Sequence, residues 1–280
     1  MLSYRHAFHA GNHADVLKHA ILLQVLEYMR LKEKPFLYVD THAGAGKYDL
    51  TAAGPSKSQE FTTGIARIWH DASLPDALHR YCEIVRAMNP QQDLRQYPGS
   101  PMLAQSMMRS GDKARLFELH STEFALLNDM FGRQRQFKVE ACDGLQALNA
   151  VLPPQSRRAV VLIDPAYEVK TDYQRVVQTL KSAYQRFATG VYLLWYPVVN
   201  REYVNRLERE FIASGIKDMV LFELAIMPDL SNTGMTASGM IVINPPWQLE
   251  QTMRTILPYL QNRLGHAEGS DWRIKRLAPE

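Results

Sequence analysis

The sequence predicts an α/β fold built on a largely parallel sheet. Short apolar runs typical of buried strands alternate along most of the chain with amphipathic stretches typical of helices. Several apolar runs end in an acidic residue or a turn of small residues, as strands do where they meet a ligand crevice. Because 46% of the 280 residues are hydrophobic, the chain can bury a large core. Strands joined through helices imply crossover connections and a sheet covered on both faces.

The first predicted elements are a helix, a strand and a turn. Asn12 can cap a helix over residues 13–32, whose apolar side chains recur at helical spacing. A short strand over residues 36–39 follows. In the turn after this strand, Gly44 and Gly46 stand where a backbone can approach a ligand closely.

The other strands are predicted from six further apolar runs. They lie at residues 114–119, 137–141, 159–163, 190–196, 218–225 and 239–243. Helical stretches, such as residues 172–186 and 202–213, separate most of them.

An insertion is predicted between the first turn and the second strand. In a nucleotide-binding unit the acidic residue at the end of the second strand lies about 20 residues past the glycine turn. Here Glu118 follows Gly46 by 72 residues, and helical patterns broken by prolines fill the interval. We therefore divide the chain into three parts. They are residues 1–50, with the N-terminal tail, first helix, first strand and turn; residues 51–110, an inserted helical subdomain; and residues 111–280, the rest of the α/β domain.

Charge and cysteine content exclude several classes of protein. The formal net charge is only +3, so affinity for a nucleic acid must come from local basic patches. The candidates at residues 133–138, 157–158 and 201–209 are interpreted as solvated faces. Cys82 and Cys142 have no CxxC spacing, so neither a disulfide framework nor a thiolate zinc site is predicted. No apolar run approaches about 20 residues, and we expect a cytoplasmic protein without a signal peptide or membrane span.

The loop after residues 159–163 has the groups needed to hold an exocyclic amine of a planar base. Asp164 supplies a carboxylate, Pro165 fixes a backbone carbonyl, and Tyr167 offers a flat ring. The proline also pushes Asp164 toward extended backbone angles, which aims its side chain into a crevice. Two acceptors can draw the protons of an aromatic amine out of plane, which makes its nitrogen a better nucleophile.

A second loop has a sequence similar to that of the loop at Asp164. Asn244-Pro245-Pro246-Trp247 also follows an apolar strand. That strand is the last one predicted and lies three strands beyond the one that ends at Asp164. We therefore assign the catalytic loop to Asp164 and interpret residues 244–247 as a rigid turn that packs near the site.

The first turn and the next two strand ends favour one cofactor. A phosphate-binding P-loop is disfavoured because Lys47 is followed by Tyr48 rather than Ser or Thr, and a nicotinamide-binding turn lacks its third glycine. Glu118 ends the second strand, and Asp143-Gly144 follows the third. Carboxylates at two successive strand ends can bind ribose hydroxyls and an adenine amine, which suits S-adenosylmethionine.

The histidines near the N-terminus do not predict a metal site. His6, His9, His13 and His19 have no thiolate partners or acidic cluster, and only His9 and His13 have the spacing of one helix face. Cys142 lacks a proline-cysteine loop and is interpreted as a small core residue rather than a nucleophile.

A set of motifs spread over nearly the whole chain carries a family resemblance. They are the opening residues 1–18 with Tyr4, His6, His9, Gly11, Asn12 and Lys18, the turn at residues 40–46, Tyr97-Pro98-Gly99-Ser100-Pro101, Glu118-Leu119-His120, and Met235-Thr236-Ala237-Ser238-Gly239-Met240. Together with the long insertion, they closely resemble the bacterial 23S ribosomal RNA adenine-N6 methyltransferases.

That resemblance implies a Rossmann-like class I fold that uses S-adenosylmethionine and RNA. It implies cofactor contacts from His19, His42, Ser100, Glu118, Asp143, Gly144 and Asp164, with Gly44 and Gly46 of the turn expected beside them. It also implies that Tyr4 touches the RNA and that the tail, with His6 and Lys18, closes over the site. The chain departs from the family pattern at Ala166, where a second proline is usual, and this change removes no acceptor.

The expected activity is in-line methyl transfer from S-adenosylmethionine to N6 of one adenine in 23S ribosomal RNA. The base would be flipped out and held by Asp164, the Pro165 carbonyl and Tyr167. Two alternatives stay open, a DNA adenine-N6 methyltransferase and a non-catalytic, methyltransferase-like RNA-binding module. We expect a monomer with no membrane partner.

Overall fold

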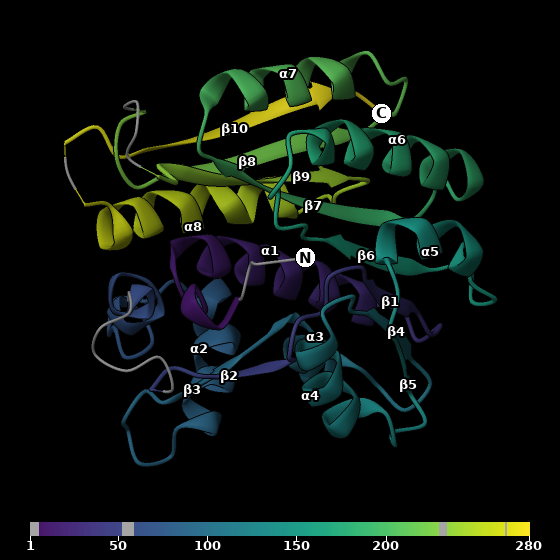
Figure 1. The fold of residues 1–280 in the computed structure, drawn as a ribbon. Coiled ribbons are helices and arrows are strands. Elements are labelled where there is room, and N and C mark those ends of the chain that lie inside the picture. The colour runs from purple at the N-terminus through teal and green to yellow at the C-terminus, as the bar shows by residue number, and fades with distance from the viewer. Residues whose placement is uncertain (1–5, 52–58, 230–233, 267) are drawn as a thin grey trace.

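An eight-stranded sheet lies between two layers of helices in the computed structural model, which describes residues 6–51, 59–229, 234–266 and 268–280 (Figure 1). The sheet has the order β10-β8-β9-β7-β6-β1-β4-β5, and β2 and β3 form a separate pair. The strands are β1 (Leu37–Asp40), β2 (Lys47–Asp49), β3 (Gln96–Pro98), β4 (Lys113–Phe117), β5 (Phe137–Glu140), β6 (Ala159–Ile163), β7 (Val191–Val198), β8 (Met219–Ala225), β9 (Ala237–Ile243) and β10 (Asp271–Ala278). The α-helices are α1 (His13–Arg30), α2 (Asp76–Met88), α3 (Ser100–Met107), α4 (Ser121–Phe131), α5 (Gly144–Val151), α6 (Thr171–Arg186), α7 (Arg201–Ile212) and α8 (Leu249–Leu264).

Five neighbouring strands are parallel, as predicted. β5, β4, β1, β6 and β7 pair in that order, and β1 lies at the centre with β4 on one side and β6 on the other. Their carboxyl ends therefore meet at one edge of the sheet, where the connecting loops form a crevice. Strand β6, beside β1, is buried along its whole length, in keeping with its unbroken apolar sequence.

The sheet is mixed rather than parallel throughout, and it contains a strand that the sequence did not predict. β9 is antiparallel to both β7 and β8, and β10 is antiparallel to β8. β10 was missed because its sequence, Asp-Trp-Arg-Ile-Lys-Arg-Leu-Ala, is rich in charge. It is an edge strand, for which charged side chains are usual because they discourage pairing with another chain.

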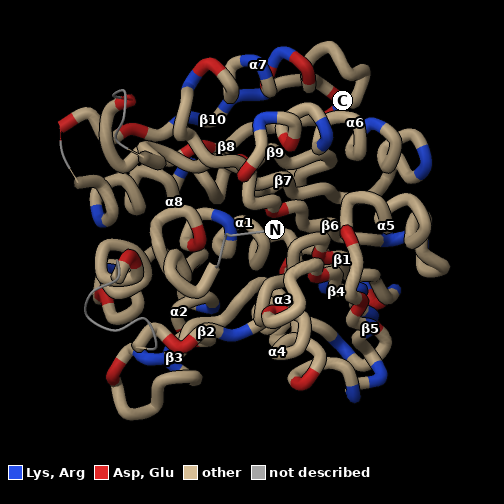
Figure 2. The backbone as a smooth tube through the Cα atoms, in the orientation of Figure 1, with Lys and Arg blue, Asp and Glu red and all other residues tan. Residues whose placement is uncertain are grey.

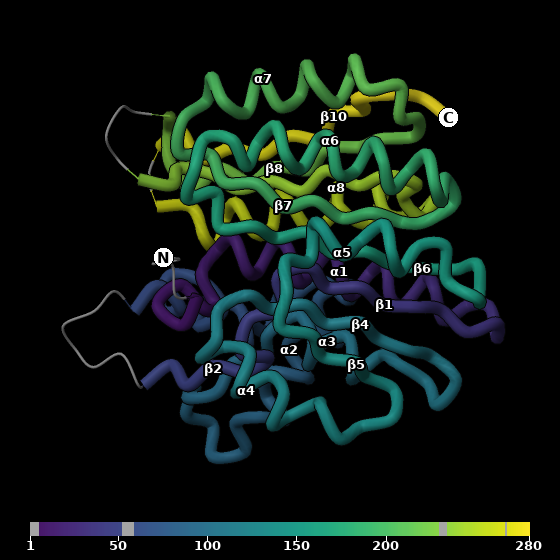
Figure 3. The backbone as a smooth tube through the Cα atoms, turned by 45° about the vertical axis from the view of Figure 1, so that its right-hand side comes forward, coloured from purple at the N-terminus to yellow at the C-terminus, as the bar shows by residue number. Residues whose placement is uncertain are grey.

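The two helix layers bury separate halves of the core. α1 and α8 pack against one face of the sheet, and α5, α6 and α7 lie side by side on the other (Figure 3). Helix α1 begins as predicted, because Asn12 accepts hydrogen bonds from the amides of Ala14 and Asp15 at 3.0 Å each. It ends at Arg30, two residues before the predicted end.

The segment between β1 and β4 contains β2, α2, β3 and α3. Two short 3₁₀ helices, Glu60–Thr63 and Ile65–Arg67, and the α-helix α2 lie in the interval for which the sequence predicted helical patterns. The strands β2 and β3 pair with each other beside the glycine turn, which the sequence did not predict. Helix α3 is the crossover that leads into β4, so the last part of the proposed insertion connects neighbouring strands of the main sheet. The division at residues 51 and 110 stays a prediction.

Candidate active site

A cavity of about 350 Å³ opens at the carboxyl edge of β1, β4 and β6, at the start of α5. Its volume lies in the range usual for sites that bind small molecules. Residues from four strand ends and from α1 line it: His6, Lys18, His19, Thr41, His42, Ala43, Gly44, Tyr48, Gly99, Ser100, Glu118, Leu119, His120, Glu123, Asp143, Gly144, Leu145, Asp164, Pro165, Ala166, Glu168, Val169, Asp172, Arg175 and Trp195. The structure thus brings together most of the residues that the sequence proposed for the site.

The glycine turn after β1 lines the cavity at residues 41–44. Gly44 has a φ of +58°, and a Cβ there would lie 2.1 Å from the hydroxyl oxygen of Tyr48. Gly46 does not line the cavity. Its carbonyl accepts the amide of Gly99 at 2.9 Å, and its Cα faces Phe131. Gly46 therefore shapes the turn, whereas Gly44 borders the ligand space.

Glu118 and Asp143 stand at successive strand ends, as predicted. The Glu118 carboxylate accepts the amides of Gly44 at 2.8 Å and His120 at 2.7 Å, and burial raises its pKa. One oxygen of Asp143 caps α5 by accepting the amide of Leu145 at 3.0 Å. The other oxygen pairs with Arg175, and these bonds outweigh burial and lower the pKa of Asp143. Both carboxylates are held in place and keep lone pairs for hydroxyl or amine donors.

A buried hydrogen-bond network supports the turn from below. Asp40 is fully buried and accepts the hydroxyls of Tyr38 at 2.7 Å and Ser100 at 2.6 Å. Burial raises the pKa of Asp40 to about 6. Ser100 lines the cavity, and because its proton goes to Asp40 it can only accept a hydrogen bond from a ligand. Burial lowers the pKa of His42 to about 4, so that imidazole is neutral.

The Asp164 carboxylate lies in the cavity and is paired with a buried lysine. Lys18 Nζ lies 2.5 Å from an Asp164 oxygen and 2.8 Å from an Asp15 oxygen. The side chain of Asp164 is 15% exposed, whereas those of Lys18 and Asp15 are 5% and 1% exposed. Burial disfavours the ammonium, but attraction from the two carboxylates outweighs it and raises the pKa of Lys18. Helix α1 thus carries a positive charge to the loop at Asp164.

His6 and His19 reach the site from either end of this cluster. His6 Nε2 lies 2.9 Å from an Asp15 oxygen, which also accepts the amide of Gly11 at 2.9 Å. His19 is buried and shares a hydrogen bond of 2.8 Å with the hydroxyl of Tyr97, and burial lowers its pKa to about 3. Both rings line the cavity. Tyr4, which the resemblance implied would contact RNA, lies outside the described residues.

Trp195 and Tyr48 line the cavity, whereas Tyr167 does not. The Tyr167 hydroxyl donates to the carbonyl of Trp195 at 2.8 Å, and its ring packs 4.5 Å from that of Tyr173. Tyr167 is not among the residues that line the cavity, so its predicted role as the stacking ring is not supported. Trp195 was not predicted from the sequence, although an aromatic residue near the end of a strand next to β6 was an available signal.

The rival loop at Asn244 lies at the opposite edge of the sheet. Because β9 is antiparallel to β7, its carboxyl end lies beside the amino end of β7, and Asn244 donates to the carbonyls of Ala188 at 2.7 Å and Gly190 at 2.6 Å. The expectation that residues 244–247 pack near the site was therefore wrong. The assignment of the catalytic loop to Asp164 stays a prediction, without this competitor beside it.

The four N-terminal histidines have different surroundings. His9 pairs with Glu60 at 2.9 Å, and His13 is buried with a pKa that burial lowers to about 4. Among the residues with described placement, no three His, Cys, Asp or Glu side chains are arranged to hold a metal ion. Cys82 is buried in the core, whereas Cys142 is only partly buried beside the sheet.

Positive charge is spread over the surface, and some predicted patches have structural roles. Lys and Arg alternate with Asp and Glu on the outer helices and loops (Figure 2). Lys138 and Arg206 are exposed, as expected for solvated faces. Arg158 is not a free surface charge, because it donates to the carbonyl of Met29 at 2.7 Å. Arg201 binds Glu223 at 2.9 Å and Asp229 at 2.6 Å. Within the described parts of the chain, no helix is long and apolar enough to cross a membrane.

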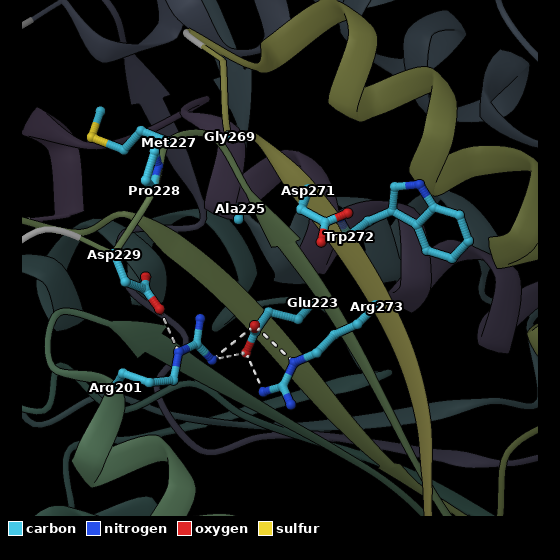
Figure 4. Close-up of a pocket in the computed structure, with 10 residues that line it drawn as sticks. All are labelled: Arg201, Glu223, Ala225, Met227, Pro228, Asp229, Gly269, Asp271, Trp272 and Arg273. Atoms are coloured by element: carbon cyan, nitrogen blue, oxygen red, sulfur yellow. Dashed lines mark hydrogen bonds and ion pairs between the residues drawn. The ribbon is translucent and has the colours of Figure 1, made fainter.

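Arg201 belongs to a second cavity of about 330 Å³, near the ends of β8 and β10 (Figure 4). Glu223 lies between Arg201 and Arg273 and accepts hydrogen bonds from both. Asp229 and Asp271 also line the space, so three carboxylates face the two guanidinium groups. This second cavity therefore has no excess of positive charge that would select a phosphate.

The first cavity fits a ligand that is cationic and rich in donors. Six carboxylates line it against two permanent cations, Lys18 and Arg175. Two polar atoms in its wall, His120 Nδ1 and Glu123 Oε2, are buried without a hydrogen-bond partner among the described residues. Hydroxyl and amine groups of a ligand can satisfy such atoms. The sulfonium, ribose hydroxyls and amines of S-adenosylmethionine match this set.

The strand order, the glycine turn and the acidic crevice define a Rossmann-like class I methyltransferase fold. A model of the family described as "Ribosomal RNA large subunit methyltransferase D, RlmJ" matches residues 33–276. Two relatives named "Ribosomal RNA large subunit methyltransferase J" cover all of this chain and are themselves covered fully. The one from Escherichia coli strain K12 is 49% identical over 280 residues, and the one from Haemophilus influenzae is 46% identical over 281. A crystal structure of a Legionella pneumophila protein has a TM-score of 0.89 and 36% identity, over 96% of this chain and 98% of that one.

The chain therefore belongs to the ribosomal RNA large subunit methyltransferase family that this model describes. Its cofactor is S-adenosylmethionine, as the resemblance implied.

Proposed function

We propose that this methyltransferase transfers a methyl group to N6 of one adenine in 23S ribosomal RNA. The observation that carries the proposal is Asp164, whose carboxylate stands in the cavity beside Pro165 at the end of β6. A carboxylate and a neighbouring backbone carbonyl are the two acceptors that an aromatic amine needs. S-adenosylmethionine supplies an electrophilic methyl group when bound.

In this proposal Asp164 and the Pro165 carbonyl orient the amine. As they accept hydrogen bonds from its two N–H groups, the nitrogen lone pair leaves conjugation with the ring and points toward the methyl donor. Positioning of this kind supplies much of the acceleration of a bimolecular reaction. Lys18 Nζ, 2.5 Å from an Asp164 oxygen, donates a hydrogen bond to this carboxylate and fixes its direction. The base must leave its stack to reach these groups.

We further propose that the N-terminal segment closes over the site and contacts RNA. His6 and Lys18 both bind Asp15, at 2.9 and 2.8 Å, so the start of the chain is connected to the catalytic loop through one carboxylate. Tyr4 would extend this contact to the substrate. Amide exchange of residues 1–12 should slow when S-adenosylhomocysteine and RNA are both present, and equal exchange with and without them would contradict the closure.

The test of the activity is methylation of protein-free 23S ribosomal RNA with labelled cofactor, followed by mapping of the modified nucleoside. We expect N6-methyladenosine at one position, and no methylation of duplex DNA. Asp164→Ala should abolish methylation, and Asn244→Ala, at the opposite edge of the sheet, is the control that should retain it. Full activity of the Asp164→Ala variant, or a different methylated nucleoside, would overturn the proposal.

The non-catalytic alternative makes an opposite prediction about the cofactor. An RNA-binding module has no use for the carboxylates at the ends of β4 and β5, whereas the proposed enzyme requires them. Calorimetry should detect S-adenosylmethionine binding that Glu118→Ala weakens, and an absence of binding would favour the module. We also propose that the protein acts as a monomer, which light scattering on the purified chain will test.

A further inference from the structure

Trp195 lies directly beside the catalytic loop in the sheet. In the parallel pair β6–β7, Leu194 is the register partner of Ile163, so the next residues, Trp195 and Asp164, are neighbours at the carboxyl edge. The Trp195 side chain packs on the α1 side of the sheet, and Lys18 Nζ lies 6.0 Å from the centre of its ring. Trp195 therefore lines the same space as the proposed amine acceptor.

The surroundings of Trp195 are not those of an ordinary core residue. On the same face of β7, Val191 and Leu193 are buried aliphatic residues, whereas Trp195 is only half-buried. Its indole nitrogen is shielded from solvent yet has no hydrogen-bond partner among the described residues. Buried indole N–H groups usually find an acceptor. The indole N–H of Trp195 thus makes no hydrogen bond here. We therefore look to the flat aromatic surface of the ring for the role of this residue.

The main chain of Trp195 is held by the catalytic loop. The Tyr167 hydroxyl donates to the Trp195 carbonyl at 2.8 Å, and the two ring centres are 6.0 Å apart at an angle of 56°. Tyr167 thereby fixes the loop that follows Asp164 to the strand that carries Trp195. This contact gives Tyr167 a positioning role that does not require it to touch the base.

We infer that Trp195 forms the aromatic wall of the target-base subsite and stacks on the flipped adenine. This inference rests on the proposed function and names the residue that takes the role first assigned to Tyr167. Every nucleobase presents a π face, and stacking on an aromatic ring leaves the edge of the base free. With one face of adenine against Trp195, its N6 edge can turn toward Asp164 in the neighbouring strand. Trp195 would then contribute to binding of the base, and Asp164 to its orientation.

A fluorescence titration tests contact with the base. The protein is saturated with S-adenosylhomocysteine, so that the cofactor site is filled, and is then titrated with adenosine. Stacking should quench part of the tryptophan emission, and this part should vanish in Trp195→Phe. Trp247→Phe is the matched control, because that ring is 81% exposed and follows Asn244 at the opposite edge. An equal quench in wild type and Trp195→Phe would overturn the inference.

Kinetics test the contribution of the ring to the reaction. Trp195→Ala should lower kcat/KM for RNA by about 5- to 140-fold, the usual value of stacking one base converted at about 1.4 kcal/mol per tenfold. Trp195→Phe keeps a ring and loses no hydrogen bond, so it should recover most of this loss. The affinity for S-adenosylmethionine should be the same in both variants. Wild-type kcat/KM in Trp195→Ala, or a parallel loss of cofactor affinity, would show that the ring does not bind the substrate base.

The two experiments separate this inference from the proposed function. If wild type forms no N6-methyladenosine on ribosomal RNA, the proposed function fails, and the adenosine titration still decides whether Trp195 contacts a purine. If wild type forms N6-methyladenosine while Trp195→Ala is as active as wild type, the proposed function stands and the inference fails.

Discussion

Replacement of Asp15 by alanine should destabilise the protein more than any single surface substitution. Asp15 is 1% exposed in its side chain and accepts hydrogen bonds from His6 and from the amide of Gly11, both at 2.9 Å. It also pairs with Lys18 at 2.8 Å. Asp15→Ala leaves the buried Lys18 ammonium with only Asp164 of its two carboxylate partners, and it removes the acceptor of the Gly11 amide. Loss of one partner from a buried ion pair costs about 3–5 kcal/mol. We therefore expect Asp15→Ala to lower the free energy of unfolding by about 3–5 kcal/mol.

The assay is urea unfolding monitored by circular dichroism. Wild type and variant are compared with the same dependence of unfolding free energy on urea concentration, the m value. Asp76→Ala is the control, because Asp76 is also in the first turn of a helix but its side chain is fully exposed. Its unfolding midpoint should stay that of wild type. A loss below about 1 kcal/mol in Asp15→Ala would refute the reasoning, since it would place the Lys18 ammonium in water rather than in a buried cluster.

The same comparison has a defined dependence on pH. Burial opposes ionisation of Asp15, but His6, Lys18 and His19 outweigh it and hold its pKa well below the usual value. A lowered pKa in the folded state gives stability that is present above the unfolded pKa of about 3.9 and lost as the pH falls toward the folded pKa. The difference in unfolding free energy between wild type and Asp15→Ala should therefore be constant from about pH 7 to pH 5. It should narrow below about pH 4.

Three further predictions concern the buried carboxylate, the turn and the helix cap. Burial raises the pKa of Asp40 from 3.8 to about 6. Wild type should therefore lose up to about 3 kcal/mol of stability relative to Asp40→Asn as the pH rises from about 4 to about 7. A constant difference between the urea midpoints of the two proteins over this pH range would contradict the prediction. Gly44→Ala should weaken S-adenosylmethionine binding at least about tenfold in calorimetry, because the new Cβ meets Tyr48, whereas Gly215→Ala, with φ of +79° and nothing within 4 Å, should bind normally. Asn12→Ala removes the cap of α1 and the hydrogen bond to Glu60, and should lower the unfolding free energy by about 1–2 kcal/mol, measured by urea titration.

The parts of the fold that depend on local pattern could be predicted from the sequence. The unbroken apolar run of β6 and the cap of α1 at Asn12 both appear where the sequence placed them. β10 could not be found this way, since a charged edge strand has no apolar alternation to detect. The antiparallel direction of β9 also depends on which strands it pairs with, and no local pattern encodes that.

The residues of the candidate site also divide into those that a local sequence pattern predicts and those that depend on long-range contacts. Glu118, Asp143 and Asp164 could be placed in one crevice from the sequence, because each follows a predicted strand and the carboxyl ends of parallel strands meet at one edge of the sheet. The pairing of Lys18 with Asp164 joins residues 146 positions apart, and only the resemblance had pointed to Lys18. The roles of Tyr167 and Trp195 depend on which ring faces the cavity, and the sequence offers both rings equally.

The reversed direction of β9 affects how short motifs should be searched for in related genomes. Residues 244–247, Asn-Pro-Pro-Trp, have the sequence expected of an amine-binding loop, yet they lie at the edge of the sheet opposite the crevice. A four-letter pattern identifies a catalytic loop only together with the polarity of the strand that precedes it. In proteins with this strand order, a search on sequence alone will find the loop at residues 244–247 in addition to the loop at Asp164.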